Sequence, residues 1–388
     1  MKRLRKLSDK GVVEVTEDII INILYCLPSK SLARFKCVSK HWLKFIADSS
    51  LSYSCRSRRW RPQPNLIGFF YQARDTYERL KIRFFFSSKE SSLVIDGSLD
   101  ESVNSLGRKR VYIVSSSNGF LLCIDLTGVY YVYNPATRQR LALPKPRVET
   151  NDPTVGFICK VDDSDKDVIS FTVVRHWDYL SSVTVECFSS ETNVWTVNNL
   201  NVDARPLRRW NYKTLKSPSA GVIDGVFCWL YYFQQITAYG SVHKRFCGLE
   251  LPHDQHMVFT DHCFLGFSGG AFYYALNVGT TITVWRLESN IRSRDAVWVR
   301  KYAANFASTV LQCLEAFRLI DSPPIEVQNM DIHPAIPHIF YLNVRGKVIS
   351  YDLETNIAEL VYDFGEYCWR TEYYKLFAYE WHQWPRLL

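Results

Sequence analysis

The stretch NGFLLCIDLTGVYYVYNPATRQ (residues 118–139) decides the fold of this 388-residue chain. Two runs rich in β-branched and aromatic residues lie on either side of a turn at Thr127-Gly128, and Asn134-Pro135 forms a second turn. Short runs of this composition, bounded by turn residues, are typical of β-strands. The stretch therefore predicts a β-hairpin.

The same plan recurs along the chain, with copies that begin near residues 183, 224, 269 and 338. Each copy has a strand entered through Gly or a polar turn, and a second strand that ends in a turn such as SSETN or DLETN. In the copy at 224 the two strands expected to pair are VFCWLYY and FCGLELPHDQ. A four-stranded propeller blade takes roughly 40 to 50 residues, and stacking such blades radially buries their faces. We therefore predict an all-β domain, a β-propeller of five to seven blades, in which strands dominate to the end of the chain.

Upstream of the strands, residues 15–53 have a helical rather than an extended period. Apolar residues recur at helical spacing in three short runs, and a hydroxyl residue precedes each run as a candidate N-cap: Thr16, Ser29 and Ser39. Pro28 ends the first run. Because domains below about 40 residues rarely bury enough surface to fold alone, this small all-α, three-helix module is expected to need a partner.

The spelling LPSKSLARFKCVSKHW (residues 27–42) closely resembles the F-box of plant F-box proteins. The resemblance implies that the module binds the small, acidic adaptor subunit of a cullin-RING ubiquitin ligase by a helix-in-groove contact, and reaches the cullin through it. The implied adaptor-facing residues are Val15, Thr16, Ile20, Ile23, Leu27, Pro28, Leu32, Val38 and Trp42. The family usually opens with Leu-Pro where this chain has Val15-Thr16, a departure that bears on adaptor affinity. The alternative is an ordinary helical cap on the next domain.

The strand-rich stretch from SSSNGFLLCIDLTGVYYVYNPATRQ to VECFSSETNVW resembles the F-box-associated, kelch-like domain of plant F-box proteins. Together the two resemblances imply a substrate-recognition subunit of an SCF-type E3 ubiquitin ligase, whose β domain binds an unknown target protein and which itself catalyses nothing. The alternative is a propeller that binds a glycan or another small ligand. A propeller hydrolase is disfavoured because spacing pairs no carboxylates and no nucleophile with a base.

The implied division is a basic, disordered N-terminus at 1–12, the F-box at 13–54, a linker at 55–65 that contains Pro62 and Pro64, and the propeller-like domain at 66–388. Residues 1–62 hold 14 Lys and Arg against 5 Asp and Glu, a net charge of +9, whereas the remainder holds 33 against 34, a net charge of −1. A nucleic-acid binder would carry its basic surface on the main domain, so this function is disfavoured.

The cysteines and the N-terminus indicate the cytoplasm or the nucleus. The 11 cysteines form an odd, scattered set without a C-x-x-C pair, which is typical of a reducing compartment. The first residues, MKRLRKLSDK, are charged, and no apolar run reaches the roughly 18 residues of a membrane-spanning helix. We therefore expect no membrane segment.

Four further motifs are candidates for a catalytic, metal-binding or protein-binding site. Gly266-Phe267-Ser268-Gly269-Gly270 spells G-x-S-x-G, but a strand pattern follows it, so we expect a hairpin turn rather than a nucleophile elbow. A zinc site is disfavoured because the spacing of the candidate ligands fits no common zinc pattern; they are His253, His256, His262 and Cys263. A calcium loop is disfavoured because the required glycine and glutamate are absent; its candidate residues are Asp162, Asp163, Asp165 and Asp167. No metal or cofactor is predicted. The candidate target-binding patch combines cationic and aromatic side chains: Arg205, Arg208, Arg209, Trp210 and Tyr212.

Overall fold

The computed structural model describes the two units of the chain separately, with their boundary between residues 62 and 63. The described residues are 19–20, 35, 38–47, 65–74, 80–88, 99, 111–150, 153–161, 169–179, 182–201, 220–223, 225–231, 235–241, 244–252, 262–291, 296–316, 327–365 and 375–381.

In the N-terminal unit the described helix is α3 (Lys40–Ala47). Its start is capped as the sequence predicts, because the Trp42 backbone N–H donates to Ser39 Oγ at 3.1 Å. The Leu43 N–H donates to the Ser39 carbonyl at 2.9 Å and closes the first turn. The other two predicted caps, Thr16 and Ser29, lie outside the described residues, so the three-helix prediction is supported for its last helix alone.

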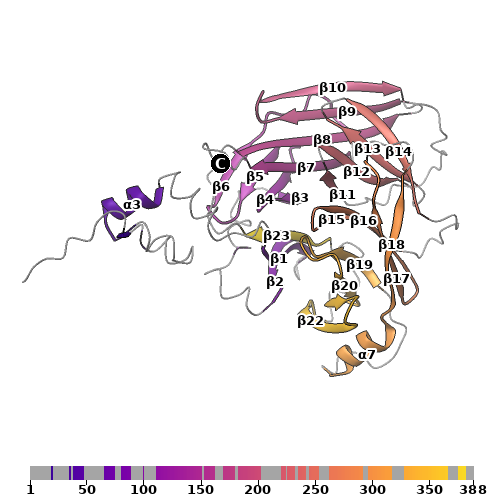
Figure 1. The fold of residues 1–388 in the computed structure, drawn as a ribbon. Helices are drawn as coiled ribbons and strands as arrows, with labels where there is room; N and C mark the ends of the chain where they lie inside the picture. Colours follow the sequence, from indigo (N-terminus) through magenta and orange to yellow (C-terminus); the bar gives the residue numbers. More distant parts are fainter. Residues whose placement is uncertain are drawn as a thin grey trace, which may run out of the picture. The chain divides into compact units, whose positions relative to one another are not determined.

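The second unit contains six antiparallel sheets, which we number as blades 1 to 6 (Figure 1). Blade 1 contains β2 (Leu80–Phe86), β1 (Asn65–Arg74) and β23 (Phe377–Trp381). Blade 2 contains β3 (Val111–Ser117), β4 (Phe120–Asp125), β5 (Tyr130–Asn134) and β6 (Gln139–Ala142). Blade 3 contains β7 (Thr154–Val161), β8 (Ile169–Tyr179), β9 (Ser182–Ser189) and β10 (Val194–Asn201).

The remaining blades repeat this plan. Blade 4 contains β11 (Ala220–Ile223), β12 (Val226–Tyr231), β13 (Gln235–Gly240) and β14 (Arg245–Glu250). Blade 5 contains β15 (His262–Ser268), β16 (Ala271–Val278), β17 (Thr281–Leu287) and β18 (Trp298–Asn305). Blade 6 contains β19 (Val327–Ile332), β20 (Ile339–Val344), β21 (Lys347–Asp352) and β22 (Ile357–Asp363).

Six apolar clusters join these sheets into a closed ring. Each cluster is shared by two neighbouring blades, such as Phe120 and Tyr130 of blade 2 with Phe171 and Phe188 of blade 3. The remaining clusters join blades 1 and 2, 3 and 4, 4 and 5, and 5 and 6, and the last joins blade 6 back to blade 1. The fold is therefore a six-bladed β-propeller, within the predicted range of five to seven.

Blade 1 closes the ring with segments from the two ends of the propeller unit. The late strand β23 pairs antiparallel with β1, and Phe69 lies opposite Ala378. β1 pairs on its other side with β2. Removal of β1 would leave both β2 and β23 without a pairing partner, whereas removal of β23 would leave β1 paired with β2 alone.

Two predictions about local structure need correction. In the copy at 224, VFCWLYY and FCGLELPHDQ are not paired with each other, because β13 lies between β12 and β14 and pairs with both. A helix, α7 (Ala307–Ala316), interrupts the expected run of strands. Its signals are local: the Asn305 side chain accepts the Ala307 N–H at 3.0 Å, and the buried residues Val310 and Leu314 are four apart on one helical face.

Cys123, Cys159 and Cys228 are free thiols that are completely buried, and Cys187, Cys263 and Cys313 are free thiols that are partly buried. Burial raises the pKa of the Cys123 thiol to about 12, so it stays protonated and packs as a small apolar group. Within the described part of the chain, no helix is long and apolar enough to cross a bilayer.

Candidate functional site

The first candidate site is the apolar surface beside α3. Val38 is 61% exposed and Leu43 is 44% exposed, whereas the rings of Phe35 and Trp42 pack together with their centroids 5.1 Å apart. Val38 and Trp42 belong to the predicted adaptor-facing set. Leu43 does not, although it directly follows Trp42 and lies in the same first turn of α3.

Ile20 of the predicted adaptor-facing set is half-buried and its neighbour Ile19 is exposed. The other predicted adaptor-facing residues lie outside the described part of the chain. They are Val15, Thr16, Ile23, Leu27, Pro28 and Leu32.

The second candidate site is a pocket of about 480 Å³ between the outer parts of blades 4 and 5. The indoles of Trp285 on β17 and Trp298 on β18 line it together with the Arg300 side chain. On the side of blade 4, the pocket is lined by Glu250 at the end of β14, by Leu251 and by Pro252. Sequence reasoning missed this pocket because β15 and β16 separate Glu250, at the end of β14, from the residues of β17 and β18 along the chain.

Strand register explains why these side chains share one face of blade 5. Trp285 lies opposite Arg300, and Leu287 lies opposite Trp298. A β-bulge between Val284 and Trp285 gives Lys301 no partner in this register, which is how a bulge re-aims the side chains beside it. The Arg300 cation therefore lies opposite the Trp285 indole in the register of β17 and β18.

A direct hydrogen bond links the two blades at this pocket. Trp298 Nε1 donates to the Glu250 backbone carbonyl at 3.0 Å. The Tyr274 ring lies between the indoles, with centroids 5.6 Å from Trp285 and 6.2 Å from Trp298. Trp and Arg are the residue types most enriched at the energetic centres of protein interfaces, so the pocket has the composition of a binding site.

A cluster of charged side chains lies on β17 and β18 outside the lining of the pocket, and Arg286 alternates with Trp285 and Leu287, so it faces the other side of blade 5. Lys301 Nζ lies 3.0 Å from Glu288 Oε1, and Arg286 Nε lies 3.5 Å from the same oxygen. The hydrogen bond from Lys301 lowers the pKa of the Glu288 carboxyl. The Glu288 carboxylate therefore stays ionised at neutral pH and keeps both of its ion pairs.

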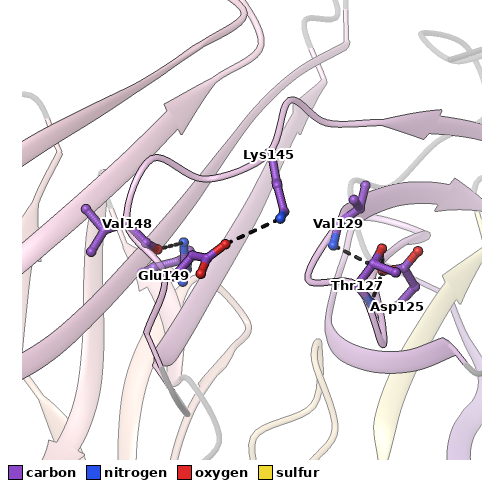
Figure 2. A network of polar contacts seen from close by, with 7 residues as sticks. Asp125, Thr127, Val129, Lys145, Val148 and Glu149 are labelled. Carbon is purple, nitrogen blue, oxygen red and sulfur yellow. Dashed lines mark hydrogen bonds and ion pairs between the residues drawn. The ribbon is translucent and has the colours of Figure 1, made fainter.

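A different polar network braces blades 2 and 3. Arg175 Nη1 lies 2.7 Å from Glu186 Oε2, and both side chains are buried. Glu186 Oε1 also accepts the Arg147 backbone N–H at 2.5 Å, and Arg175 donates to the Val148 carbonyl at 3.4 Å. Figure 2 shows Val148 in the loop between the blades, near the exposed ion pair of Lys145 and Glu149. Both charged side chains, Arg175 and Glu186, bind each other and the backbone of this loop, so the role of the network is structural.

Three ionisable groups lie on or beside the innermost strands of blades 6 and 1. Burial raises the pKa of the Asp331 carboxyl to about 7 and that of the Glu380 carboxyl to about 7. Burial lowers the pKa of the Lys375 amine to about 8, and its Nζ donates to the Val114 carbonyl on β3 at 3.3 Å. The side chains of all three residues are partly exposed to solvent, although protein atoms surround most of each charged group. Lys375 thus holds the start of β23 against blade 2.

The G-x-S-x-G motif forms a hairpin turn, as predicted. Gly269 and Gly270 have φ of +53° and +81° and connect β15 to β16, which is a strand and not the helix of a nucleophile elbow. Ser268 is buried, and its Oγ donates to the His333 carbonyl at 2.6 Å on the neighbouring blade. The serine therefore joins blades 5 and 6.

The residues considered above for zinc and calcium, and the predicted target-binding patch, lie mostly outside the described residues. Among the residues that the structure does describe, no three His, Cys, Asp or Glu side chains gather closely enough to hold a metal ion. The residues outside the description are His253, His256, Asp162, Asp163, Asp165 and Asp167, together with the patch residues Arg205, Arg208, Arg209, Trp210 and Tyr212. The patch stays a prediction.

Comparison with known proteins gives two family matches, and its relatives include two that match over most of the chain. Residues 91–371 match the family described as F-box protein At3g26010-like, beta-propeller, and residues 15–53 match the F-box domain. F-box protein At5g03970 of Arabidopsis thaliana is 26% identical over 89% of this chain and 82% of its own. F-box protein At5g49610 of the same plant is 25% identical over 94% and 92%. A solved structure titled YCF48 from Cyanidioschyzon merolae is 9% identical over 76% of this chain and 85% of its own, with a TM-score of 0.41.

Proposed function

The chain belongs to the plant family of F-box proteins that carry an At3g26010-like β-propeller, and from this premise we propose that it recruits a target protein to an SCF-type cullin-RING ubiquitin ligase. The N-terminal module docks to the adaptor subunit, and the propeller holds the target for ubiquitination. The observation that carries this proposal is the presence of both family matches on one chain, at 15–53 and at 91–371.

The adaptor contact is supported by exposed apolar side chains and by charge. Val38 and Leu43 expose apolar surface beside α3, as the helices of a helix-in-groove complex do before they bind. Residues 1–62 carry 14 Lys and Arg against 5 Asp and Glu. This positive charge steers the module toward an acidic partner and speeds their encounter.

Target recognition is assigned to the pocket between blades 4 and 5. Trp285, Trp298 and Arg300 offer two large aromatic surfaces and a planar cation, which suits an extended protein segment with an aromatic or acidic side chain. The patch at 205–212 has the same residue types and is proposed as a second contact with the target.

The protein contributes proximity rather than a chemical step. A target held on the propeller meets the charged ubiquitin carrier at a raised effective concentration, so its lysines react as if in an intramolecular process. No residue of this chain needs to exchange a proton or form a covalent bond with the target. The proposed sites of action are the cytoplasm and the nucleus.

The experiment is capture of the purified adaptor by the full-length chain. Substitution of Leu27 and Pro28 together by Ala removes the centre of the motif and should abolish capture. The propeller should unfold at the same temperature as in the wild-type chain, since its six clusters use no residue of that motif. Undiminished capture by the double variant would overturn the proposal.

A second candidate function is the binding of a glycan or another small ligand, and the pocket favours it because indole faces stack on sugar rings. A thermal-shift screen with oligosaccharides would identify such a ligand by a raised unfolding temperature that Trp298→Ala abolishes. Stabilisation by a sugar without any protein partner would favour this candidate over target recruitment.

A further inference from the structure

Among the residues that the structure describes, β10 (Val194–Asn201) forms the outer edge of blade 3 (Figure 1). Its sequence, VWTVNNLN, contains no charged residue, no proline and no glycine. It pairs with β9 over all eight residues without a register shift. In an edge strand every second residue directs its N–H and C=O away from the sheet, so β10 offers a regular template for another strand.

The outer strands of the other described sheets are protected in ways that β10 is not. Each carries at least one charged residue, and two also contain a β-bulge, which are two devices that natural sheets use to prevent edge pairing. The charged residues are Lys81 and Arg83 in β2, Arg140 in β6, Arg245 and Glu250 in β14, Arg300 and Lys301 in β18, and Glu359 and Asp363 in β22. The bulges lie at the β17–β18 and β21–β22 pairs.

The β10 edge is also held in place. Trp195 is buried against Phe188 and Tyr130, and its Nε1 donates to the Pro144 carbonyl at 2.7 Å. This bond ties β10 to the loop that the buried Arg175 and Glu186 pair braces. A strand fixed in this way loses little further freedom when another strand adds to it.

We propose that this edge pairs with the β10 edge of a second copy of the chain, across a two-fold axis. A two-fold axis perpendicular to an antiparallel sheet sets one residue opposite its own copy. When that residue is Val197, residues 194–200 of the two copies overlap and the sheet becomes continuous over both blades. Val194 and Val197, which are 42% and 37% exposed, then each gain a cross-strand neighbour from the second copy, and Val197 lies beside its own copy.

Charge favours a second copy as the occupant of this edge. Self-pairing of a charged strand brings like charges close to one another, and like charges directly opposite are destabilising. That cost applies at the other outer strands and is absent at β10. The region after residue 62 holds 33 Lys and Arg against 34 Asp and Glu, so the propeller domains of two copies carry almost no net charge and hardly repel each other.

The dimer would use one surface patch on both subunits, which is the closed, isologous arrangement of most homodimers. It would carry two N-terminal modules and two pockets between blades 4 and 5. A target with two recognition segments would then bind one assembly with avidity.

The test is sedimentation velocity of the full-length chain over a hundredfold range of concentration. The wild-type chain should pass from the 45.2 kDa monomer to a species of twice that mass. Val197→Lys should stay monomeric, because it sets two ammonium groups opposite each other. Val299→Lys is the matched control, since Val299 is a 39% exposed valine on another outer strand, and it should dimerise like the wild type.

Mixing charge variants separates loss of pairing from loss of folding. Val197→Lys and Val197→Glu should each sediment as monomers, whereas an equal mixture should form a heterodimer through a cross-strand ion pair. A wild-type chain that stays monomeric throughout would overturn the proposal and leave the edge to a segment of another protein. Dimerisation of Val197→Lys equal to that of the wild type would overturn it as well.

Discussion

The N-terminal helical unit and the propeller differ in where their apolar side chains lie. In the propeller, six clusters are each shared by two blades, and residues such as Phe69 and Trp195 are buried. In the described part of the N-terminal unit, Val38, Leu43 and Ile19 are exposed. The propeller buries large apolar clusters between its own blades, whereas the described part of the helical unit leaves these apolar side chains exposed, as the proposed adaptor contact requires. Substitutions in the first should therefore change stability, and substitutions in the second should change binding.

The largest expected effect is on stability and comes from the buried pair between Arg175 and Glu186. Glu186→Ala leaves the Arg175 guanidinium buried without its carboxylate and frees the Arg147 N–H. We expect a loss of about 3 to 5 kcal/mol in the free energy of unfolding, measured by urea denaturation. The control is Lys145→Ala, which removes an exposed ion pair with Glu149 and should cost less than about 1 kcal/mol. Equal losses for the two variants would refute a structural role for the buried network.

The next effect is a pH dependence of propeller stability that comes from His176. Burial lowers the pKa of this imidazole to about 4, and its ring packs against Trp229 at 4.5 Å between centroids. The unfolded chain, with a histidine pKa of about 6.5, binds a proton first as the pH falls, so stability is lost between about pH 6.5 and pH 4. From pH 7 to pH 5 we expect the wild-type chain to lose about 2 kcal/mol more than His176→Gln.

The difference between wild type and His176→Gln matters because other groups act in the opposite direction. Asp331 and Glu380 have raised pKa values of about 7, so their contributions to stability are present at low pH and are lost as the pH rises through 7. These contributions cancel when the two chains are compared. Identical pH profiles would show that His176 is accessible to protons in the folded state.

The smallest expected effect on stability comes from the exposed residues beside α3. Val38→Asp and Leu43→Asp remove no buried contact in the propeller, so its unfolding free energy should change by less than about 0.5 kcal/mol. Differential scanning calorimetry of the full-length chain checks this. A shift of several degrees in the main transition would mean that the two units share a core, and the comparison between them would fail.

The sequence predicts the hairpins of the propeller well because their signals are local. Turn residues such as Gly128 and Asn134 lie beside alternating apolar runs, and the same is true of Gly269 and Gly270. Ser39 was likewise predicted as a helix cap from its own neighbours. What the sequence does not predict depends on residues far apart along the chain.

The number of blades depends on the pairing of β1 with β23, which joins residues near 69 to residues near 378. The pocket requires blades 4 and 5 to meet, and the pairing of Trp285 with Arg300 depends on a strand register that leaves no clear mark in the sequence. The sequence shows that residues 194–201 contain no charged residue, but only the fold shows that β10 is the outer strand of a blade.

The central claim is that the N-terminal unit is completed by the adaptor, and calorimetric titration of purified adaptor into the full-length chain tests it most directly. We predict saturable binding by the wild-type chain and at least a tenfold loss of affinity for Val38→Asp with Leu43→Asp. Val278→Asp, a 51% exposed position on the propeller, should bind like the wild type. Equal affinity of the wild-type chain and the double variant would contradict the claim.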